Sequence, residues 1–324
     1  MRIAVTGALG HIGSRLIREI PEAFPAAEIV LVDNLVTQRY SSLFSLPSAG
    51  KYRFIEADIV TSDLEPIFSG ADAVVHLAAL TDPAESFRKR EEVARVNTEG
   101  TRRVARVCLK SKCPILFAST TSVYGETSLS PYAESKLEAE RLLQRMGVEE
   151  GLRFVICRFG TIFGVSPGMR FSTAVNKFCW QAVMGRPLSV WRTAWTQMRP
   201  YLELGDACRT VQIILQRRLF DGGIYNVLTT HAAVSDVVRI LSGLLPEVRV
   251  EWVDAEGMNL LSYRLSSDPL KSLGFEFHGD LEKGIREIVG LIRSANFHCD
   301  APIHEEPFHK PLVIPAKAGI LEET

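Results

Sequence analysis

A tyrosine and a lysine four residues apart are the side chains of this sequence with the clearest chemical potential. Tyr132 and Lys136 lie in the segment Ser130 to Met146, which is predicted to be a helix because Ser130 can cap it and Pro131 suits its first turn. Residues four apart share one face of a helix. A nearby cation lowers the pKa of a tyrosine by roughly one to three units, so the pair predicts a phenolate base. An exposed surface pair without a catalytic role has the same spacing.

The overall composition is that of a globular protein with a substantial core. The chain has 324 residues, of which 46% are apolar and 23% are charged, and 37 basic residues nearly balance 38 acidic ones. The net charge of -1 argues against a nucleic-acid-binding protein. No stretch approaches the roughly 18 consecutive apolar residues of a membrane span, and no secretory leader is recognised. We therefore expect a soluble, cytoplasmic protein without a membrane partner.

Cysteine and histidine spacing predicts neither a disulfide framework nor a metal centre. Six cysteines are scattered without CxxC spacing, which is typical of reduced thiols. His298, Cys299, His304 and His309 cluster near the end of the chain, but their spacing matches no standard metal framework. We expect no metal site.

A glycine-rich turn follows the first predicted strand. The apolar segment Arg2 to Thr6 predicts a strand, Gly7, Gly10 and Gly13 come next, and a helix is predicted from Ser14. A strand, a glycine turn and a helix in this order bind a pyrophosphate through backbone N–H groups and the helix dipole. The spacing is GxxGxxG, which by itself is weak evidence.

An acidic residue at the end of the second predicted strand indicates which dinucleotide fits. The segment Glu28 to Val32 ends at Asp33 and Asn34, twenty residues beyond Gly13. A carboxylate here accepts hydrogen bonds from the adenosine ribose and repels a 2'-phosphate, which favours NAD over NADP. A simple turn-capping role for Asp33 is the alternative.

Strands and helices alternate through the first half of the chain. This alternation predicts an α/β fold with a Rossmann-type doubly wound parallel sheet and a smaller C-terminal substrate-binding lobe. Ligands of such sheets bind at the carboxyl ends of the strands, where Asp58, His76 and Thr120 fall. For His76 we favour a hydrogen-bonded core histidine over a functional group.

The alternation also predicts where the domains begin and end. We expect residues 1–165 to form the NAD-binding domain, with 199–229 returning to it. Residues 166–198 and 230–293 are predicted to form the substrate-binding lobe. Residues 294–324 have little periodicity and are predicted to form a C-terminal tail.

Taken together, these motifs resemble the extended short-chain dehydrogenase/reductase family, and most closely its NAD-dependent nucleotide-sugar epimerase/dehydratase branch. The resemblance covers about residues 1–293. It rests on Thr6 to Gly13, Asp33-Asn34, Asp58-Ile59, His76 to Ala79, Asn97, Ser119 to Gly125, Tyr132 to Lys136, Arg158 to Gly164, Arg199 to Tyr201 with Asp206, and Tyr263-Arg264 ahead of Leu273 to Phe275.

The resemblance implies a set of cofactor contacts along the strand ends. It implies NAD as cofactor and a Rossmann domain with a smaller C-terminal lobe. The implied contacts are Gly7, Gly10, His11, Ile12 and Gly13 at the pyrophosphate, Asp33 and Asn34 at the ribose, Asp58 and Ile59 at adenine, and Leu77, Ala78, Ala79, Asn97, Tyr132 and Lys136 in the nicotinamide half.

The resemblance also implies catalytic and substrate-binding residues, with a nucleotide-diphosphate sugar as substrate. Thr120, Tyr132 and Lys136 would be catalytic: Tyr132 as base, Lys136 as the group that holds the ribose and keeps Tyr132 ionised, and Thr120 as a hydrogen-bond donor to the sugar oxygen. Substrate contacts are expected from Thr81, Thr121, Ser122, Thr161, Asn176, Arg199 and Arg264. For the two arginines of this set a structural salt bridge is the alternative.

The two residues that follow Thr120 differ between branches of the family. The 4,6-dehydratases of the family carry Asp-Glu there, and this chain has Thr121 and Ser122, so the acid and base for elimination are missing. We therefore predict a nucleotide-sugar 4-epimerase that acts through a transient 4-keto intermediate. The alternatives are a 4-keto reductase that consumes free NAD(P)H and a non-catalytic NAD-binding regulator. The family commonly forms dimers, so a homodimer is also expected.

Overall fold

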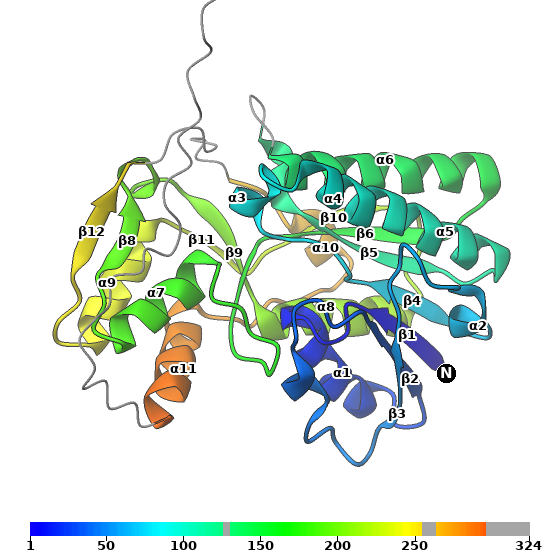
Figure 1. Cartoon of the computed structure of the whole chain (residues 1–324), viewed down its shortest axis with the longest axis horizontal. Coiled ribbons are helices and arrows are strands. Elements are labelled where there is room, and N and C mark those ends of the chain that lie inside the picture. Colours follow the sequence, from blue (N-terminus) through cyan, green and yellow to red (C-terminus); the bar gives the residue numbers. More distant parts are fainter. Residues whose placement is uncertain (126–129, 255–263, 296–324) are drawn as a thin grey trace, which may run out of the picture.

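A seven-stranded parallel sheet is the centre of the larger part of the molecule (Figure 1). The computed structural model describes residues 1–125, 130–254 and 264–295. The strand order reverses between β1 and β4, which is the switch point at which ligands bind in such sheets. The strands in spatial order are β10 (Ile224–Val227), β6 (Phe154–Phe159), β5 (Ile115–Thr120), β4 (Ala73–His76), β1 (Arg2–Thr6), β2 (Glu28–Asp33) and β3 (Lys51–Glu56).

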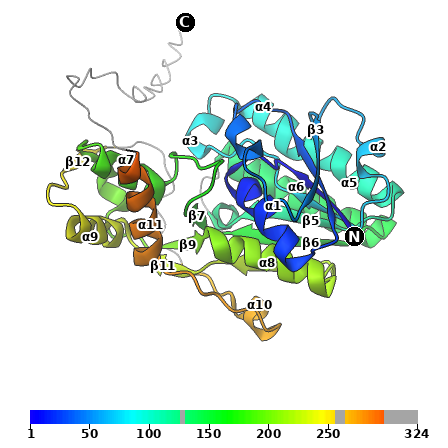
Figure 2. The same ribbon diagram turned by 90° about the horizontal axis from the view of Figure 1, so that it is seen from below.

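Helices cover both faces of this sheet because its inner strands are apolar on both sides. In β1, Ile3 and Val5 enter one core and Ala4 enters the other. The first core lies under α1 (His11–Ala23) and α8 (Leu204–Arg217), which pack side by side (Figure 2). The second lies under α2 (Glu65–Phe68), α5 (Thr101–Lys110) and α6 (Pro131–Glu150). The predicted Rossmann-type α/β fold is confirmed.

A smaller lobe with its own core lies beside the sheet, on the left of Figure 1. Its two sheets have the orders β11-β9-β7 and β12-β8. Helix α8 and strand β10 return to the large sheet, whereas β9 pairs with β7 and β11 in the lobe. The elements of the lobe are β7 (Thr161–Phe163), α7 (Ala174–Val183), β8 (Leu188–Trp191), η4 (Arg192–Ala194), β9 (Arg199–Glu203), β11 (Thr230–Ala232), α9 (Val234–Leu244), β12 (Val250–Val253) and α11 (Leu281–Ser294).

Helix α6 forms where the sequence predicts it. The Ser130 hydroxyl caps the helix by accepting a hydrogen bond from the Ala133 amide, and Pro131 occupies the first turn. Gly151 ends it in the left-handed conformation that glycine adopts without strain. The remaining connections contain η1 (Tyr40–Leu43), α3 (Pro83–Ser86), α4 (Arg90–Ala94), η2 (Arg95–Gly100), η3 (Thr121–Tyr124) and α10 (Asp268–Ser272).

Candidate active site

Tyr132 and Lys136 both lie on the buried face of α6, against the carboxyl end of β5. Tyr132 is 9% exposed and Lys136 is 3% exposed, so the pair is not the surface pair that the spacing also allowed. The Thr120 side chain lies beside the Tyr132 phenol and, by hydrogen bonding, acts to lower the pKa of that phenol. The Lys136 ammonium donates to the carbonyl oxygen of Ala118 at 2.8 Å. The structure thus brings the three predicted catalytic residues together.

The pKa values at this site differ from those of free side chains. Burial raises the pKa of Tyr132, and this is opposed by the positive charge of Arg170 and by the hydrogen bond with Thr120. Burial lowers the pKa of Lys136 to about 7, against the opposing effect of Glu140. Arg170 is the cation whose charge opposes the rise in the pKa of Tyr132. That Lys136 keeps Tyr132 ionised stays a prediction.

The residues after Thr120 form a polar turn beside the tyrosine. The Ser122 amide donates to the Thr120 hydroxyl oxygen at 3.1 Å, and the two hydroxyl groups are 3.2 Å apart. Thr121 is buried, and Ser122 is partly exposed. No carboxylate occupies positions 121 and 122, so this turn provides hydroxyl hydrogen bonds and no acid–base pair.

The glycine turn fits a bound pyrophosphate. At Gly7, whose φ is +67°, a Cβ atom would lie 2.7 Å from the Ala78 amide nitrogen, and at Gly13 it would lie 2.4 Å from the Gly7 oxygen. These contacts allow glycine only and hold β1, α1 and the segment after β4 close together. No side chain caps α1, which leaves its first-turn amides available to an anion. Ile12 lies in this turn of α1.

His11 is a buried neutral histidine at the start of α1. Its Nε2 atom is 2.9 Å from the Gly164 oxygen, and burial lowers its pKa to about 4. Because a carbonyl oxygen only accepts, Nε2 carries the proton. The Nδ1 atom is buried without a hydrogen-bond partner among the described residues. The Arg39 guanidinium lies nearby, 3.7 Å from where a Cβ of Gly10 would stand.

The ends of β2 and β3 lead into the residues that are predicted to contact the adenosine half of NAD. The Asp33 carboxylate accepts hydrogen bonds from the amides of Leu9 and Leu35, both at 3.0 Å. The Asn34 amide donates to Asp58 at 2.9 Å. This network fixes the carboxylate of Asp33 beside the glycine turn. Ile59, the other predicted adenine contact, is buried.

The segment after β4, which includes Leu77, Ala78 and Ala79, is held against α6 by Asn97. The Asn97 side chain bonds the amide and the carbonyl of Leu80 at 2.8 and 2.9 Å and donates to the Ser135 hydroxyl at 3.0 Å. Asn97 lies in η2, a π-helical turn, a feature frequent at functional sites. His76 bonds Thr6 and Thr101 in the core, in agreement with the structural role that we favoured.

Residues 165–173, here called the strap, cross the glycine turn. Most of them were assigned to the substrate-binding lobe, but none was predicted as a site residue. The Ser166 hydroxyl donates to the His11 oxygen, and the Gly168 amide donates to the Ser14 hydroxyl, both at 2.9 Å. A Cβ at Gly168 would lie 2.3 Å from the Leu9 oxygen. The strap carries Arg170 into the site.

Arg170 joins the strap to the segment after β4. Its guanidinium donates to the hydroxyl group and to the carbonyl oxygen of Thr81. The Arg170 carbonyl accepts from the Asn176 amide at 2.9 Å, and the Asn176 carbonyl oxygen accepts from the Gly164 amide. The sequence signals that could have indicated the strap are its proline and glycine, but they do not show where its arginine lies.

The predicted substrate residues are distributed over the strap and the lobe. Thr81 is bound to Arg170, and Asn176 is fully buried and holds the strap. Thr161 begins β7, and Arg199 begins β9 with one guanidinium nitrogen 3.0 Å from Gln197 Oε1. Arg264 is exposed. Their contacts with a substrate stay predictions.

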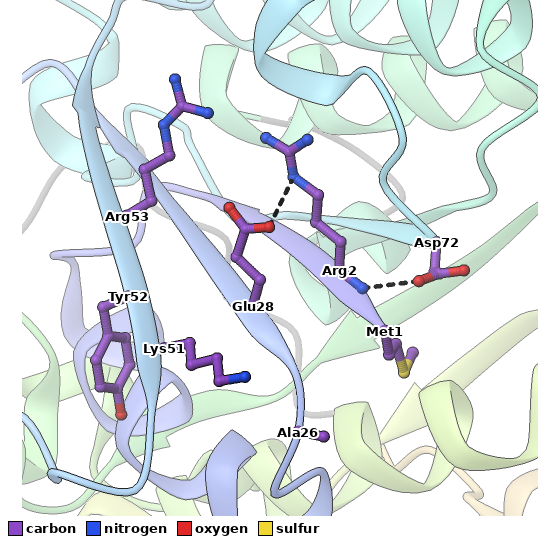
Figure 3. Close-up of a pocket in the computed structure, with 8 residues that line it drawn as sticks. All are labelled: Met1, Arg2, Ala26, Glu28, Lys51, Tyr52, Arg53 and Asp72. Atoms are coloured by element: carbon purple, nitrogen blue, oxygen red, sulfur yellow. Dashed lines mark hydrogen bonds and ion pairs between the residues drawn. The ribbon is translucent and has the colours of Figure 1, made fainter.

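A hollow at the opposite edge of the sheet does not belong to this site (Figure 3). It lies at the amino ends of β1, β2 and β3, and its lining includes Arg2, Glu28 and Asp72. The Arg2 amide donates to Asp72 at 2.7 Å. Ligands of parallel sheets bind at the carboxyl ends, so this hollow is not a candidate for the cofactor.

The described residues contain neither a metal-binding cluster nor a membrane-spanning helix. No group of three or more potential metal ligands occurs in 1–125, 130–254 and 264–295. His298, Cys299, His304 and His309 lie outside these ranges. Among the helices in the same ranges, none has both the length and the apolar character needed to cross a membrane.

The fold and the site define a class: a Rossmann-type α/β enzyme with a dinucleotide site and a Thr-Tyr-Lys group at one edge of its sheet. The sequence pattern of the NAD dependent epimerase/dehydratase family matches residues 3–227. The chain belongs to this family, and its cofactor is NAD.

Proteins similar to this chain have several related activities. A trifunctional UDP-glucose 4,6-dehydratase/UDP-4-keto-6-deoxy-D-glucose 3,5-epimerase/UDP-4-keto-L-rhamnose-reductase of Arabidopsis thaliana is 27% identical over 312 residues, 89% of this chain and 46% of the relative. This chain therefore spans about half the length of that relative. A UDP-glucose 4-epimerase of Azospirillum brasilense is 29% identical over 287 residues, 78% of this chain and 79% of the relative.

A solved structure resembles nearly the whole chain. The UDP-glucuronic acid 4-epimerase of Bacillus cereus, in complex with UDP-glucuronic acid and NAD, has a TM-score of 0.80 and 25% identity. The similarity covers 91% of this chain and 100% of that one.

Proposed function

We propose that this protein is an NAD-dependent nucleotide-sugar 4-epimerase. The observation that carries the proposal is the placement of Thr120 beside Tyr132, next to a turn that has no carboxylate at Thr121 or Ser122. A base with a hydroxyl partner and no second acid–base pair suits reversible oxidation of an alcohol without elimination of water. The 4-epimerases among the similar proteins support the same reaction.

The residues of the chain have distinct roles in this reaction. As a phenolate, Tyr132 accepts the proton of the sugar C4 hydroxyl while the C4 hydride leaves, and Thr120 donates a hydrogen bond to the resulting ketone oxygen. NAD, when bound, would accept this hydride and return it to the other face of C4. Between the two transfers the keto sugar turns over in the site, and Tyr132 then gives the proton back. The first-turn amides of α1, Asp33 and Lys136 would hold NAD.

A panel of nucleotide sugars tests this proposal. The purified chain is incubated with UDP-, GDP-, CDP- and dTDP-sugars, including UDP-glucuronic acid, and the C4 epimer and NADH are both measured. We expect formation of an epimer without net loss of NADH. Stoichiometric loss of NADH without an epimer would instead identify a 4-keto reductase.

The Tyr132→Phe variant separates an enzyme from a non-catalytic NAD-binding protein. We expect turnover to fall by about 10²- to 10⁴-fold, the usual contribution of general acid–base catalysis, while NAD stays bound. Wild-type protein that binds NAD but converts no sugar of the panel would favour the regulator. If Tyr132→Phe converts the sugar at the wild-type rate, Tyr132 is not the base.

A further inference from the structure

We propose that Asn226 is a positioning residue: its side chain fixes the segment that carries Arg264 to η3, the turn that follows Thr120. This proposal rests on the proposed function in one respect, namely that the substrate has a diphosphate joined to its sugar. It assigns a role to a side chain that the sequence did not indicate as part of the site.

Asn226 lies close to the strand that carries Thr120. It is the second-last residue of β10, at the carboxyl end, where ligands of parallel sheets bind. Its register partner on β6 is Arg158, whose partner on β5 is Ser119. Ser119 directly precedes Thr120, so β6 alone separates Asn226 from the strand that leads into η3.

The Asn226 amide group binds η3 through its oxygen. The Tyr124 hydroxyl donates to Asn226 Oδ1 at 2.9 Å. Tyr124 is the last residue of η3, and the centre of its ring lies 4.7 Å from the guanidinium carbon of Arg158. Arg158 is in turn paired with the buried carboxylate of Glu140. The ring and the hydroxyl of Tyr124 are therefore both held, which gives Asn226 a fixed partner.

The same amide group binds the segment 264–267 through its nitrogen. Asn226 Nδ2 donates to the Ser266 carbonyl oxygen at 3.1 Å. A carbonyl oxygen only accepts, so the NH2 group must face Ser266 and Oδ1 must face the Tyr124 hydroxyl. One planar group thus joins η3 to the segment 264–267. A carboxylate in its place lacks the donor, and an alkyl side chain lacks both functions.

A histidine of β11 fixes the same segment at the neighbouring peptide. The Leu265 amide donates to His231 Nε2 at 3.0 Å. Because Nε2 accepts this bond, the ring is neutral and carries its proton on Nδ1. Burial and the positive charge of Arg264 lower the pKa of His231, which favours this form. The two residues that follow Arg264 are therefore held by side chains of β10 and β11.

Arg264 is suited to bind a phosphate group of the substrate. It is exposed, and among the described residues no carboxylate pairs with it. A guanidinium group binds phosphate oxygens through two parallel hydrogen bonds. Sugar and diphosphate are covalently joined, so the position of Arg264 relative to Thr120 affects where the C4 hydroxyl lies. A displacement of about 1 Å can lower a rate by about 100-fold.

A structural contact between β10 and α10 is the alternative role for Asn226. The two elements pack together, and the segment 264–267 leads into α10. Asn226 is half-buried, so the chain should fold without its two bonds. A structural role predicts a lower unfolding midpoint and an otherwise unchanged folded protein. A positioning role predicts that η3 loses its response to a ligand bound at Arg264.

Hydrogen exchange of the NAD-bound full chain tests the proposal without turnover. UDP, GDP, CDP and dTDP are added separately, because a nucleoside diphosphate has the phosphates but lacks the sugar that reaches η3. We expect the tightest binder to slow amide exchange in the segment 264–267 and, by about threefold or more, in residues 121–125. In Asn226→Leu the slowing in residues 121–125 should be lost.

Matched variants separate the contact from general stability. Tyr124→Phe removes only the hydroxyl that binds Asn226 and should abolish the slowing in residues 121–125, while the segment 264–267 stays protected. Ser272→Ala removes a hydroxyl that bonds within α10 and should change neither. If Asn226→Leu does not fold, Tyr124→Phe tests the same contact.

A double-variant cycle tests the contact in the reaction itself. Tyr124→Phe should lower kcat by about tenfold with little change in KM, because it misplaces the turn and leaves Arg264 intact. The double variant Tyr124→Phe with Asn226→Leu should be no slower than Asn226→Leu, since both substitutions remove one shared contact. Rate losses that multiply would show two independent effects.

Three outcomes overturn the proposal. One is equal slowing of exchange in residues 121–125 of the wild type and of Asn226→Leu, and another is a segment 264–267 that none of the four diphosphates protects. The third is a pair of rate losses that multiply. Epimer formation together with either of the first two results leaves the proposed function intact. A coupled exchange response without any epimer leaves the role of Asn226 intact, so the two failures are distinguished.

Discussion

Two buried charged side chains, one turn apart on α6, have opposite surroundings. Lys136 meets a carbonyl oxygen and an aromatic ring, and the described part of the chain contains no ion pair for it. Glu140 is 1% exposed and accepts two hydrogen bonds from Arg158 Nε at 3.0 and 3.2 Å and a third from its Nη2 at 2.5 Å. The Ser119 hydroxyl also donates to this carboxylate.

The difference distinguishes a site for chemistry from a site for stability. A buried charge that is fully paired holds its neighbours in one arrangement, and removal of one partner is costly. A buried charge without a counter-ion has a shifted pKa, which is a common feature of functional sites. In α6 the proposed catalytic residues Tyr132 and Lys136 lie in the N-terminal part, and the stabilising contact follows at Glu140.

The largest effect on stability is expected from Glu140→Gln. The substitution keeps the size of the side chain and leaves Arg158 without its carboxylate, so the free energy of unfolding should fall by about 3 to 5 kcal/mol. Urea unfolding of the variant measures this change. Replacement of both Glu140 and Arg158 by apolar residues should cost much less, and an equally large loss in the double variant would contradict the role of the pair.

Lys136→Met should instead stabilise the protein in a pH-dependent manner. The pKa of Lys136 is about 7 in the folded chain against about 10.5 unfolded, so the charge destabilises the folded state fully below pH 7. Such a shift is worth about 5 kcal/mol, and loss of the bond to Ala118 removes about 1 to 2 kcal/mol of this gain. Roughly 3 to 4 kcal/mol should remain.

The stability advantage of Lys136→Met should depend on pH in one direction. Between about pH 7 and 10.5 the unfolded chain binds the proton and the folded chain does not, so wild-type stability from this group rises with pH and the advantage of Lys136→Met declines. Unfolding curves at pH values on both sides of 7 measure the trend. Because Glu140 favours the charged lysine, Glu140→Gln should move the decline to lower pH. A gain in stability that does not change with pH would contradict the lowered pKa of Lys136.

A smaller effect is expected at the start of α6. Ser130→Ala removes the side-chain cap that receives the Ala133 amide, which should lower the free energy of unfolding by about 1 kcal/mol. Thermal or urea unfolding detects a change of this size. Ser130→Asp should retain most of the wild-type stability because aspartate also caps helices.

The smallest effect is expected at the surface of the same helix. Arg90 and Glu134 form an ion pair at 3.0 Å, but their side chains are 62% and 45% exposed. Loss of an exposed pair costs at most about 1 kcal/mol, so Arg90→Gln should unfold close to the wild-type midpoint. A loss as large as that of Glu140→Gln would remove the distinction between buried and exposed pairs on this helix.

The sequence predicts those parts of the site that depend on local patterns. The glycine turn, Asp33 at the end of β2 and the Tyr132–Lys136 spacing each follow from residues within a short segment. Glu140 was missed although it continues the same face, because positions 132, 136 and 140 are each four residues apart. That spacing is a signal that could have identified it.

Arg170 could not be placed from the sequence. Its position depends on strap contacts with His11 and Ser14, more than 150 residues earlier in the chain. Nothing in the strap's composition shows which earlier segment it meets. The predicted role of Lys136 in keeping Tyr132 ionised stays a prediction, and in the structure the Lys136 ammonium donates to the Ala118 oxygen.

The bond between His11 and Gly164 has a thermodynamic consequence. It joins the start of α1 to the segment that leads into the strap, so the anion-binding turn and the arginine beside Tyr132 belong to one connected unit. A ligand bound at the turn stabilises the unit to which the turn belongs, so cofactor binding should also reduce local opening of the strap.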